Sequence, residues 1–127
     1  MPEHSAHLLI IDDNEDILFM LQTMLQMKGY KVSVKNNMEQ LYEYIERVHP
    51  DLILMDMLLS GADGREVCKY LKSDGLLASI PVIMISAHPN AEKECLEAGA
   101  NYFLGKPFEM IDLSATVAAA IEGASKR

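Results

Sequence analysis

Short, unbroken apolar runs that end in acidic residues limit most strongly what this chain can fold into. Residues 52–55 are all apolar and end at Asp56, and residues 8–11 are all apolar and end at Asp12 and Asp13. A run of this length between turn signals is typical of a strand buried on both faces. In an open parallel sheet, ligands bind in the crevice beyond the carboxyl ends of the strands. We therefore expect Asp56 to lie at the centre of the chemistry.

Segments with apolar residues at helical spacing alternate with these runs. We predict five strands and five helices: strands at 8–11, 31–35, 52–56, 80–86 and 101–104, and helices at 15–28, 38–48, 64–72, 91–98 and 107–122. Such alternation predicts an α/β fold in which helices cover both faces of a parallel sheet. The common strand order at this size is 2-1-3-4-5, which places the crevice between strands one and three.

Three local signals fix where we expect helices to begin. Asn14 is expected to cap the first helix. Asn37 and Gln40 resemble a capping box for the second helix. Pro107 is expected near the first position of the last helix.

Length and composition fit one acidic, folded domain. We expect a single domain over residues 1–127, with a core at about 7–122 and a frayed tail at 123–127. Half of the residues are hydrophobic, which excludes a disordered chain. The formal net charge is -8. Because an acidic domain repels polyphosphate, we expect no direct nucleic-acid binding.

Neither the cysteines nor the apolar segments point to an extracellular or membrane protein. Cys68 and Cys95 fall in predicted helices and lack the spacing of metal ligands, so we expect two reduced thiols. No apolar run is long enough to span a membrane, and residues 1–7 contain no apolar signal core. We therefore expect a cytoplasmic protein without membrane contact.

The acids at adjacent strand ends favour phosphoryl chemistry. Three carboxylates in one crevice would repel one another, and Mg²⁺ relieves such repulsion because it prefers oxygen ligands. An aspartate can also be a nucleophile that forms an acyl phosphate. Phosphoryl transfer needs positive charge on the transferring oxygens, which Lys106 after the last strand is placed to supply. Ser86, at the end of the fourth strand, is placed to donate its hydroxyl to a phosphoryl oxygen.

Each of these residues also has a simpler interpretation. Acids at strand ends are often solvated or cap helices, a serine there is usually a turn residue, and a lysine before a proline is usually exposed. The functional interpretation depends on the combination, because all five residues lie at the carboxyl ends of strands one, three, four and five.

In this combination the sequence resembles the receiver domains of two-component response regulators, over about residues 8–121. The matching segments are 9–14 (LIIDDN), 51–56 (DLILMD) with Asp63-Gly64, 83–87 (IMISA), 97–100 (EAGA) and 106–108 (KPF). The resemblance implies a flavodoxin-like three-layer sandwich.

The resemblance also implies the roles of the acidic residues and of the lysine. Asp56 is expected to be the phosphoacceptor, and Lys106 is expected to pair with the phosphate. Asp12, Asp13 and Asp56 are expected to bind Mg²⁺, together with the backbone carbonyl of Leu58.

Four further residues are expected to act in switching or in phosphate lifetime. Ser86 is expected to be the switch hydroxyl and Phe103 the switch aromatic. Phe103 replaces a frequent tyrosine, so the ring cannot form a phenol hydrogen bond. Leu58 and His88 flank the phosphate site along the chain. Leu58 cannot orient a hydrolytic water whereas His88 can, so we expect slow to moderate self-dephosphorylation.

Two more departures from the family pattern affect loops. Ser60 stands where the loop after Asp56 usually carries a proline. The stretch from residue 86 to residue 99 is about two residues shorter than usual, which shortens the fourth helix or the loop before it.

The resemblance implies a signalling switch that is not an enzyme but promotes its own phosphorylation and dephosphorylation. A histidine kinase or a histidine phosphotransfer protein would donate the phosphoryl group to Asp56 in a Mg²⁺-dependent reaction. Phosphorylation would then change partner binding on the face formed by helix four, strand five and helix five. A downstream effector or a second phosphorylated copy of the chain is expected there.

Two other functions are considered. A haloacid-dehalogenase-type phosphatase also uses an aspartate nucleophile, but it needs a second acid two residues later, where this chain has Leu58. A receiver fold can also act as an interaction module without phosphate. The intact set of five polar residues argues against that function.

Overall fold

The computed structural model describes residues 6–59 and 61–125. Five parallel strands form one sheet in the order β2-β1-β3-β6-β7. Their bounds are β1 (His7–Ile11), β2 (Lys31–Lys35), β3 (Leu52–Asp56), β6 (Val82–Ser86) and β7 (Tyr102–Gly105). Each lies within two residues of a predicted strand, and the predicted strand order is confirmed.

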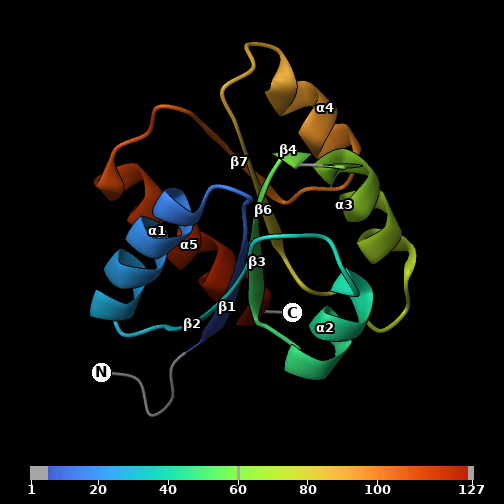
Figure 1. Ribbon diagram of the computed structural model, residues 1–127, viewed down its shortest axis with the longest axis horizontal. Helices are drawn as coiled ribbons and strands as arrows, with labels where there is room; N and C mark the ends of the chain where they lie inside the picture. The colour runs from blue at the N-terminus through green and yellow to red at the C-terminus, as the bar shows by residue number, and fades with distance from the viewer. Residues whose placement is uncertain (1–5, 60, 126–127) are drawn as a thin grey trace.

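Helices cover both faces of this sheet, as Figure 1 shows. The helices α1 (Glu15–Met27) and α5 (Met110–Ser125) lie on one face. The helices α2 (Leu41–Val48), α3 (Gly64–Ser73) and α4 (Ala91–Glu97) lie on the other. The fold is therefore the expected three-layer, flavodoxin-like sandwich.

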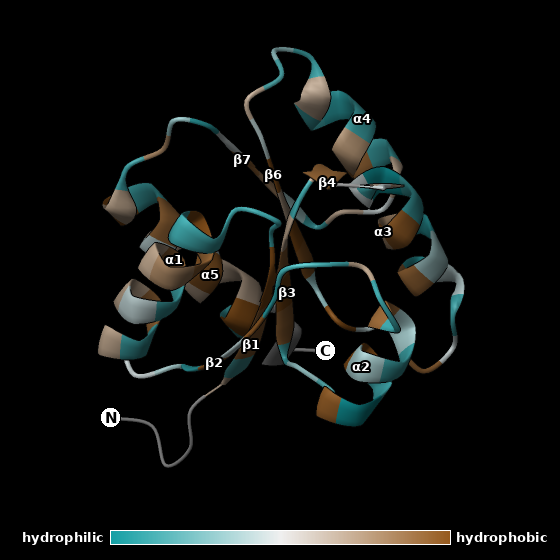
Figure 2. Cartoon of the chain, in the orientation of Figure 1, coloured by the Kyte–Doolittle hydropathy of each residue, from teal (hydrophilic) through white to brown (hydrophobic). Residues whose placement is uncertain are grey.

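The unbroken apolar runs are explained by burial on both faces of the sheet. Successive residues of a strand point to opposite faces, so Leu8 and Ile10 pack with α1 and α5. Leu9 and Ile11 pack with the helices of the other face. Figure 2 shows the strands as the most hydrophobic layer, with hydrophilic residues on the outer sides of the helices. Both faces of β1 and β3 therefore require apolar residues up to the polar strand end.

Side-chain caps begin both α1 and α3, and the cap of α1 is the predicted Asn14. The Asn14 side chain accepts a 3.1 Å hydrogen bond from the amide of Ile17 at the start of α1. The Asp63 side chain accepts a 2.9 Å hydrogen bond from the amide of Arg65 at the start of α3. Each satisfies an amide that has no partner within its helix.

The expected starts of α2 and α5 are wrong by three residues each. Gln40 adopts a left-handed backbone conformation with a φ of 51° and makes no side-chain cap, so no capping box forms. The Asn37 side chain instead accepts a hydrogen bond from the amide of Glu39. Pro107 lies in a turn before α5, because the first helical hydrogen bonds of α5 run to the carbonyl of Glu109.

A small hairpin between β3 and α3 was not predicted. The strands β4 (Leu58–Leu59) and β5 (Ala62–Asp63) pair antiparallel, with Leu58 opposite Asp63. Ser60 falls between these two strands in the sequence and lies outside the described residues. The hairpin brings the start of α3 back to the end of β3.

Three remaining expectations concern the cysteines, the C-terminal segment and membrane spans. Cys68 and Cys95 are both buried and unpaired, as expected. The helix α5 continues to Ser125, so helical backbone extends into the segment for which we expected fraying, and residues 126–127 lie outside the described part. No helix in that part combines the length and apolar character needed to cross a membrane.

Candidate functional site

Four of the predicted residues meet at one edge of the sheet. Asp56 ends β3 and Ser86 ends β6, while Asp12 directly follows β1 and Lys106 directly follows β7. Because the order β1-β3-β6-β7 makes these strands neighbours, residues from distant parts of the sequence converge at their carboxyl ends.

Both carboxylate oxygens of Asp56 have a hydrogen-bond donor. The backbone amide of Leu58 donates to Oδ1 at 3.0 Å. The Lys106 ammonium donates to Oδ2 at 2.9 Å. The Asp56 side chain is only 14% exposed, and that of Lys106 is 27% exposed, so this ion pair is partly shielded from water. The carboxylate is thereby held in one orientation beside a positive charge.

Asp12 is a buried acid in the same crevice. Its residue exposure is 3%. Burial raises the pKa of Asp12, and the neighbouring Asp56 carboxylate raises this pKa further. A hydrogen bond from the Asn14 amide to Oδ1 and the positive charge of Lys106 act in the opposite direction. The predicted repulsion between carboxylates is thus present between Asp12 and Asp56.

Asp13 is exposed and follows Asp12 directly in the chain. In residues 6–59 and 61–125, no group of three or more acidic, histidine or cysteine side chains is arranged to hold a metal ion. The structure therefore brings Asp12 and Asp56 together, and the expected role of Asp13 in metal binding stays a prediction.

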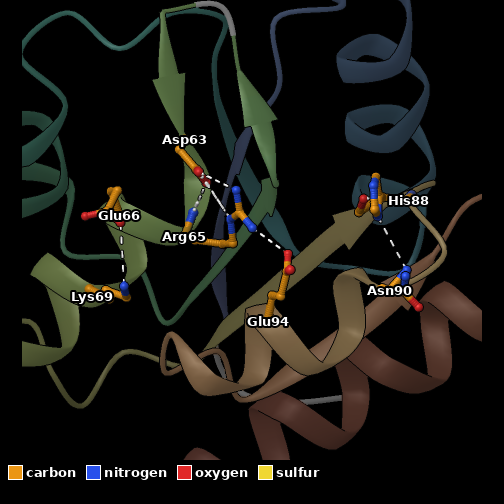
Figure 3. Close-up of polar contacts among 8 residues, drawn as sticks. Asp63, Arg65, Glu66, Lys69, His88, Asn90 and Glu94 are labelled. Atoms are coloured by element: carbon orange, nitrogen blue, oxygen red, sulfur yellow. Dashed lines mark hydrogen bonds and ion pairs between the residues drawn. The ribbon is translucent and has the colours of Figure 1, made fainter.

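Ser86 is buried, and its hydrogen bonds connect two loops. Its hydroxyl oxygen accepts a 3.0 Å hydrogen bond from the amide of His88, and its carbonyl accepts one of 2.9 Å from the amide of Lys106. Of the hydrogen bonds described here, none joins the Ser86 hydroxyl to Asp56. The side chain of His88 is exposed, and its Nδ1 lies 3.4 Å from the amide of Asn90 (Figure 3).

The two aromatic residues of β7 point to opposite faces of the sheet. Tyr102 packs on the α1 and α5 face, where its hydroxyl donates a 3.3 Å hydrogen bond to the carbonyl of Ala119. Phe103 is partly buried against the cluster on the α2, α3 and α4 face. Phe103 is therefore on the same face as α4.

Gly64 allows α3 to begin directly against the end of β3. Its amide donates a 2.6 Å hydrogen bond to the carbonyl of Met57. A Cβ at this position would lie 2.7 Å from the carbonyl oxygen of Asp56 and 3.0 Å from that of Met57. Only glycine fits this close approach of two backbone segments.

The ion pair between Arg65 and Glu94, near the candidate site, was not predicted from the sequence. Arg65, in the first turn of α3, forms ion pairs with Asp63 and with Glu94 of α4 (Figure 3). The positions of Arg65 and Glu94 are 29 residues apart, and no local pattern marks such a pair.

Comparison with known proteins identifies the family. The family model of the response regulator receiver domain matches residues 8–118. The phosphate regulon transcriptional regulatory protein PhoB of Pseudomonas aeruginosa is 36% identical over 116 residues, which cover 90% of this chain and 51% of PhoB. The chain spans about half the length of the curated relatives that it matches.

Solved structures agree with this assignment. The signal receiver domain of a signal transduction histidine kinase from Syntrophus aciditrophicus has a TM-score of 0.85 at 29% identity, over 94% of this chain and 92% of that one. The receiver domain of the sensor histidine kinase PA1611 from Pseudomonas aeruginosa has a TM-score of 0.83 at 28% identity, over 93% of this chain and 98% of that one. That structure is described with a magnesium ion coordinated in the active site cleft. By its sequence, its fold and the convergence of acids and a lysine at the strand ends, this chain belongs to the response regulator receiver domains of two-component signal transduction systems.

Proposed function

We propose that this chain accepts a phosphoryl group on Asp56 from a histidine kinase or a histidine phosphotransfer protein. The bond from phosphorus to the donor imidazole nitrogen breaks while a bond forms to an Asp56 carboxylate oxygen. The imidazole nitrogen keeps the electron pair and takes up a proton. One observation carries the proposal: the Leu58 amide and the Lys106 ammonium orient the Asp56 carboxylate, which lies in the same crevice as buried Asp12.

Lys106 is proposed to stabilise the charge that gathers on the transferring oxygens. Its ammonium already lies 2.9 Å from Asp56 Oδ2, and the hydrogen bond from its amide to the Ser86 carbonyl fixes its backbone. Phosphoryl transfer depends mainly on positioning and on positive charge of this kind. After transfer, the ammonium is proposed to pair with a phosphoryl oxygen.

Oxygen ligands for Mg²⁺ are proposed to come from Asp12, Asp13, Asp56 and the backbone carbonyl of Leu58. The fit is chemical. Burial and the neighbouring Asp56 carboxylate raise the pKa of Asp12. A hard cation that prefers oxygen ligands relieves the repulsion between the two carboxylates. When bound, Mg²⁺ supplies further positive charge to the transferring oxygens. A magnesium ion in the cleft of the PA1611 receiver domain supports this assignment.

Phosphorylation is proposed to change the surface around α4. The new group adds roughly 1.5 to 2 negative charges. We propose that the Ser86 hydroxyl moves toward a phosphoryl oxygen, which draws the segment from Ser86 to Asn90 with it. Phe103, on the same face as α4, would then reorient. The face formed by α4, β7 and α5 would bind a downstream effector or a second phosphorylated copy of the chain.

The experiment is intact-mass analysis after incubation with acetyl phosphate and Mg²⁺. The wild type is expected to gain the mass of one phosphoryl group, and Asp56→Asn is expected to gain none. Asp16 is an exposed acid of α1, and Asp16→Asn is expected to gain as much mass as the wild type. If Asp56→Asn still gains a phosphoryl group, Asp56 is not the acceptor. A wild type that gains none from acetyl phosphate or a kinase would indicate the interaction module, and steady turnover of a phosphate ester would indicate the phosphatase.

A further inference from the structure

Arg65 bridges two segments that flank the candidate phosphoacceptor site (Figure 3). Its Nε donates to Asp63 Oδ1 at 3.0 Å, and its Nη2 donates to Asp63 Oδ2 at 2.6 Å. Its Nη1 donates to Glu94 Oε1 of α4 at 2.5 Å. The guanidinium thus binds one carboxylate with two nitrogens and still reaches a second helix, which a lysine ammonium cannot reproduce.

The Asp63 end of this bridge leads to Asp56. Asp63 lies in β5, directly opposite Leu58 of β4. The amide of Leu58 is the donor that holds Asp56 Oδ1. The next residue, Gly64, donates to the carbonyl of Met57. Asp56 and Asp63 are therefore linked through one short hairpin.

The Glu94 end leads to Ser86. Glu94 lies in the first turn of α4, and the loop before this helix runs back through Asn90 and His88 to Ser86. The amide of Ala91, the first residue of α4, donates to the carbonyl of His88. Asp56 is thus linked to Asp63, and Ser86 is linked to Glu94. The ion pairs of Arg65 with Asp63 and Glu94 join these two links.

We propose that Arg65 is a positioning residue that couples phosphorylation of Asp56 to the placement of α4. This inference rests on the proposed function. In this proposal the Arg65–Glu94 pair opens when α4 moves, so that it stabilises the present arrangement relative to the phosphorylated one. Because coupling is reciprocal, breaking the pair raises the affinity of Asp56 for a phosphoryl mimic. For a pair this exposed we expect an effect of about two- to fivefold.

The chain offers matched controls for this test. Glu92 has the same charge in the same turn of α4 and is exposed. The Lys69–Glu66 ion pair is 3.6 Å long, lies within α3 and is 60% and 73% exposed. The charge of Lys69 also acts on Asp63, but this effect does not pass through the Arg65–Glu94 pair. Glu92→Ala and Lys69→Met therefore change charge and helix composition without breaking the connection between the hairpin and α4.

The test measures the dissociation constant of beryllofluoride, with Mg²⁺ present, for the full chain. Glu94→Ala is expected to bind about two- to fivefold more tightly than the wild type, and Glu92→Ala and Lys69→Met the same as the wild type. The double variant Arg65→Met/Glu94→Ala should bind beryllofluoride no more tightly than Arg65→Met alone, because the two residues act through one contact. In amide NMR spectra without ligand, Glu94→Ala should shift the Leu58 resonance and Glu92→Ala should not.

Two results would overturn the proposal, and they can be distinguished. If the wild type binds beryllofluoride and Glu94→Ala matches Glu92→Ala, the coupling is wrong and the phosphoacceptor function stands. If the wild type binds none, the proposed function is wrong and the coupling with it. Melting temperatures of all variants show whether a change in affinity reflects a loss of folded protein.

Discussion

The ammonium of Lys106 lies 2.9 Å from Asp56 Oδ2, although the two residues are 50 positions apart in the sequence. The contact depends on the order of the strands, because β6 lies between β3 and β7 and all three end at the same edge. The amide of Lys106 is bound to the carbonyl of Ser86 at the end of β6. The position of the positive charge is therefore set by the sheet.

Removing this positive charge should slow phosphorylation. Lys106→Met keeps the length of the side chain but leaves the transferring oxygens without the ammonium, so we expect a loss on the order of a hundredfold in the rate with acetyl phosphate. The measurement is the time course of phosphorylated protein by intact mass. Lys69→Met, which removes an exposed lysine of α3, is the control and should react at the wild-type rate. An equal rate for both variants would exclude Lys106 from the transfer step.

Asp12 should destabilise the fold at neutral pH. Its pKa is raised by burial and by Asp56, so the folded state holds a proton more tightly than the unfolded state. Stability therefore falls as pH rises from the ordinary carboxyl value of 3.8 through the raised value. Asp12→Asn keeps the acceptor for the Asn14 amide and removes the buried charge, so its melting temperature should exceed that of the wild type at neutral pH.

Two comparisons test this interpretation of Asp12. The stabilisation by Asp12→Asn should vanish below the ordinary carboxyl pKa, where the wild-type side chain is also neutral. Asp16→Asn should not stabilise, because Asp16 lies in the first turn of α1, where an acid favours the helix dipole. A melting temperature for Asp12→Asn at or below that of the wild type at neutral pH would contradict the burial argument.

Gly64→Ala should damage both stability and phosphorylation. The new Cβ would lie 2.7 Å from the carbonyl oxygen of Asp56, so backbone at the phosphoacceptor must move. We expect a loss of about 1–3 kcal/mol in the free energy of unfolding and slower phosphorylation. Chemical denaturation and the acetyl phosphate time course measure the two effects. Gly75→Ala is the control, because a Cβ there meets nothing within 4 Å; equal behaviour of the two variants would refute the steric argument.

His88 should shorten the lifetime of the phosphorylated form. The Leu58 side chain is exposed but apolar and cannot orient water, whereas the His88 imidazole lies at the exposed end of the Ser86 loop. We expect His88→Ala to lengthen the phosphate half-life by about two- to tenfold, less than a dedicated general base would give. Asn90→Ala keeps the backbone amide near His88 Nδ1 and serves as control. An unchanged half-life in His88→Ala would remove His88 from the hydrolysis.

The sheet and the site edge could be predicted because their signals are local and repeated. Residues 8–11 and 52–55 are apolar on both faces, and each run ends in an acid, so strand, burial and site position are marked by the same residues. Once the strands were ordered, the meeting of Asp56 with Lys106 followed from topology.

The features that were missed lack such a signal. The strands β4 and β5 have two residues each, too short for any periodicity. Gln40 adopts a left-handed conformation that glutamine rarely takes, and the spacing of Asn37 and Gln40 gives no sign of it. The pairing of Arg65 with Glu94 depends on how α3 and α4 lie together, which the order of residues in either helix does not state.

The central claim is that Asp56 becomes an acyl phosphate, and borohydride trapping tests it most directly. Borohydride reduces an aspartyl phosphate to homoserine, and peptide mass spectrometry then locates the converted residue. After phosphorylation with Mg²⁺ present, we predict homoserine at position 56 in the wild type and no conversion when Mg²⁺ is chelated. Homoserine at position 12 or 13, or no conversion in protein that has gained a phosphoryl group, would contradict the account.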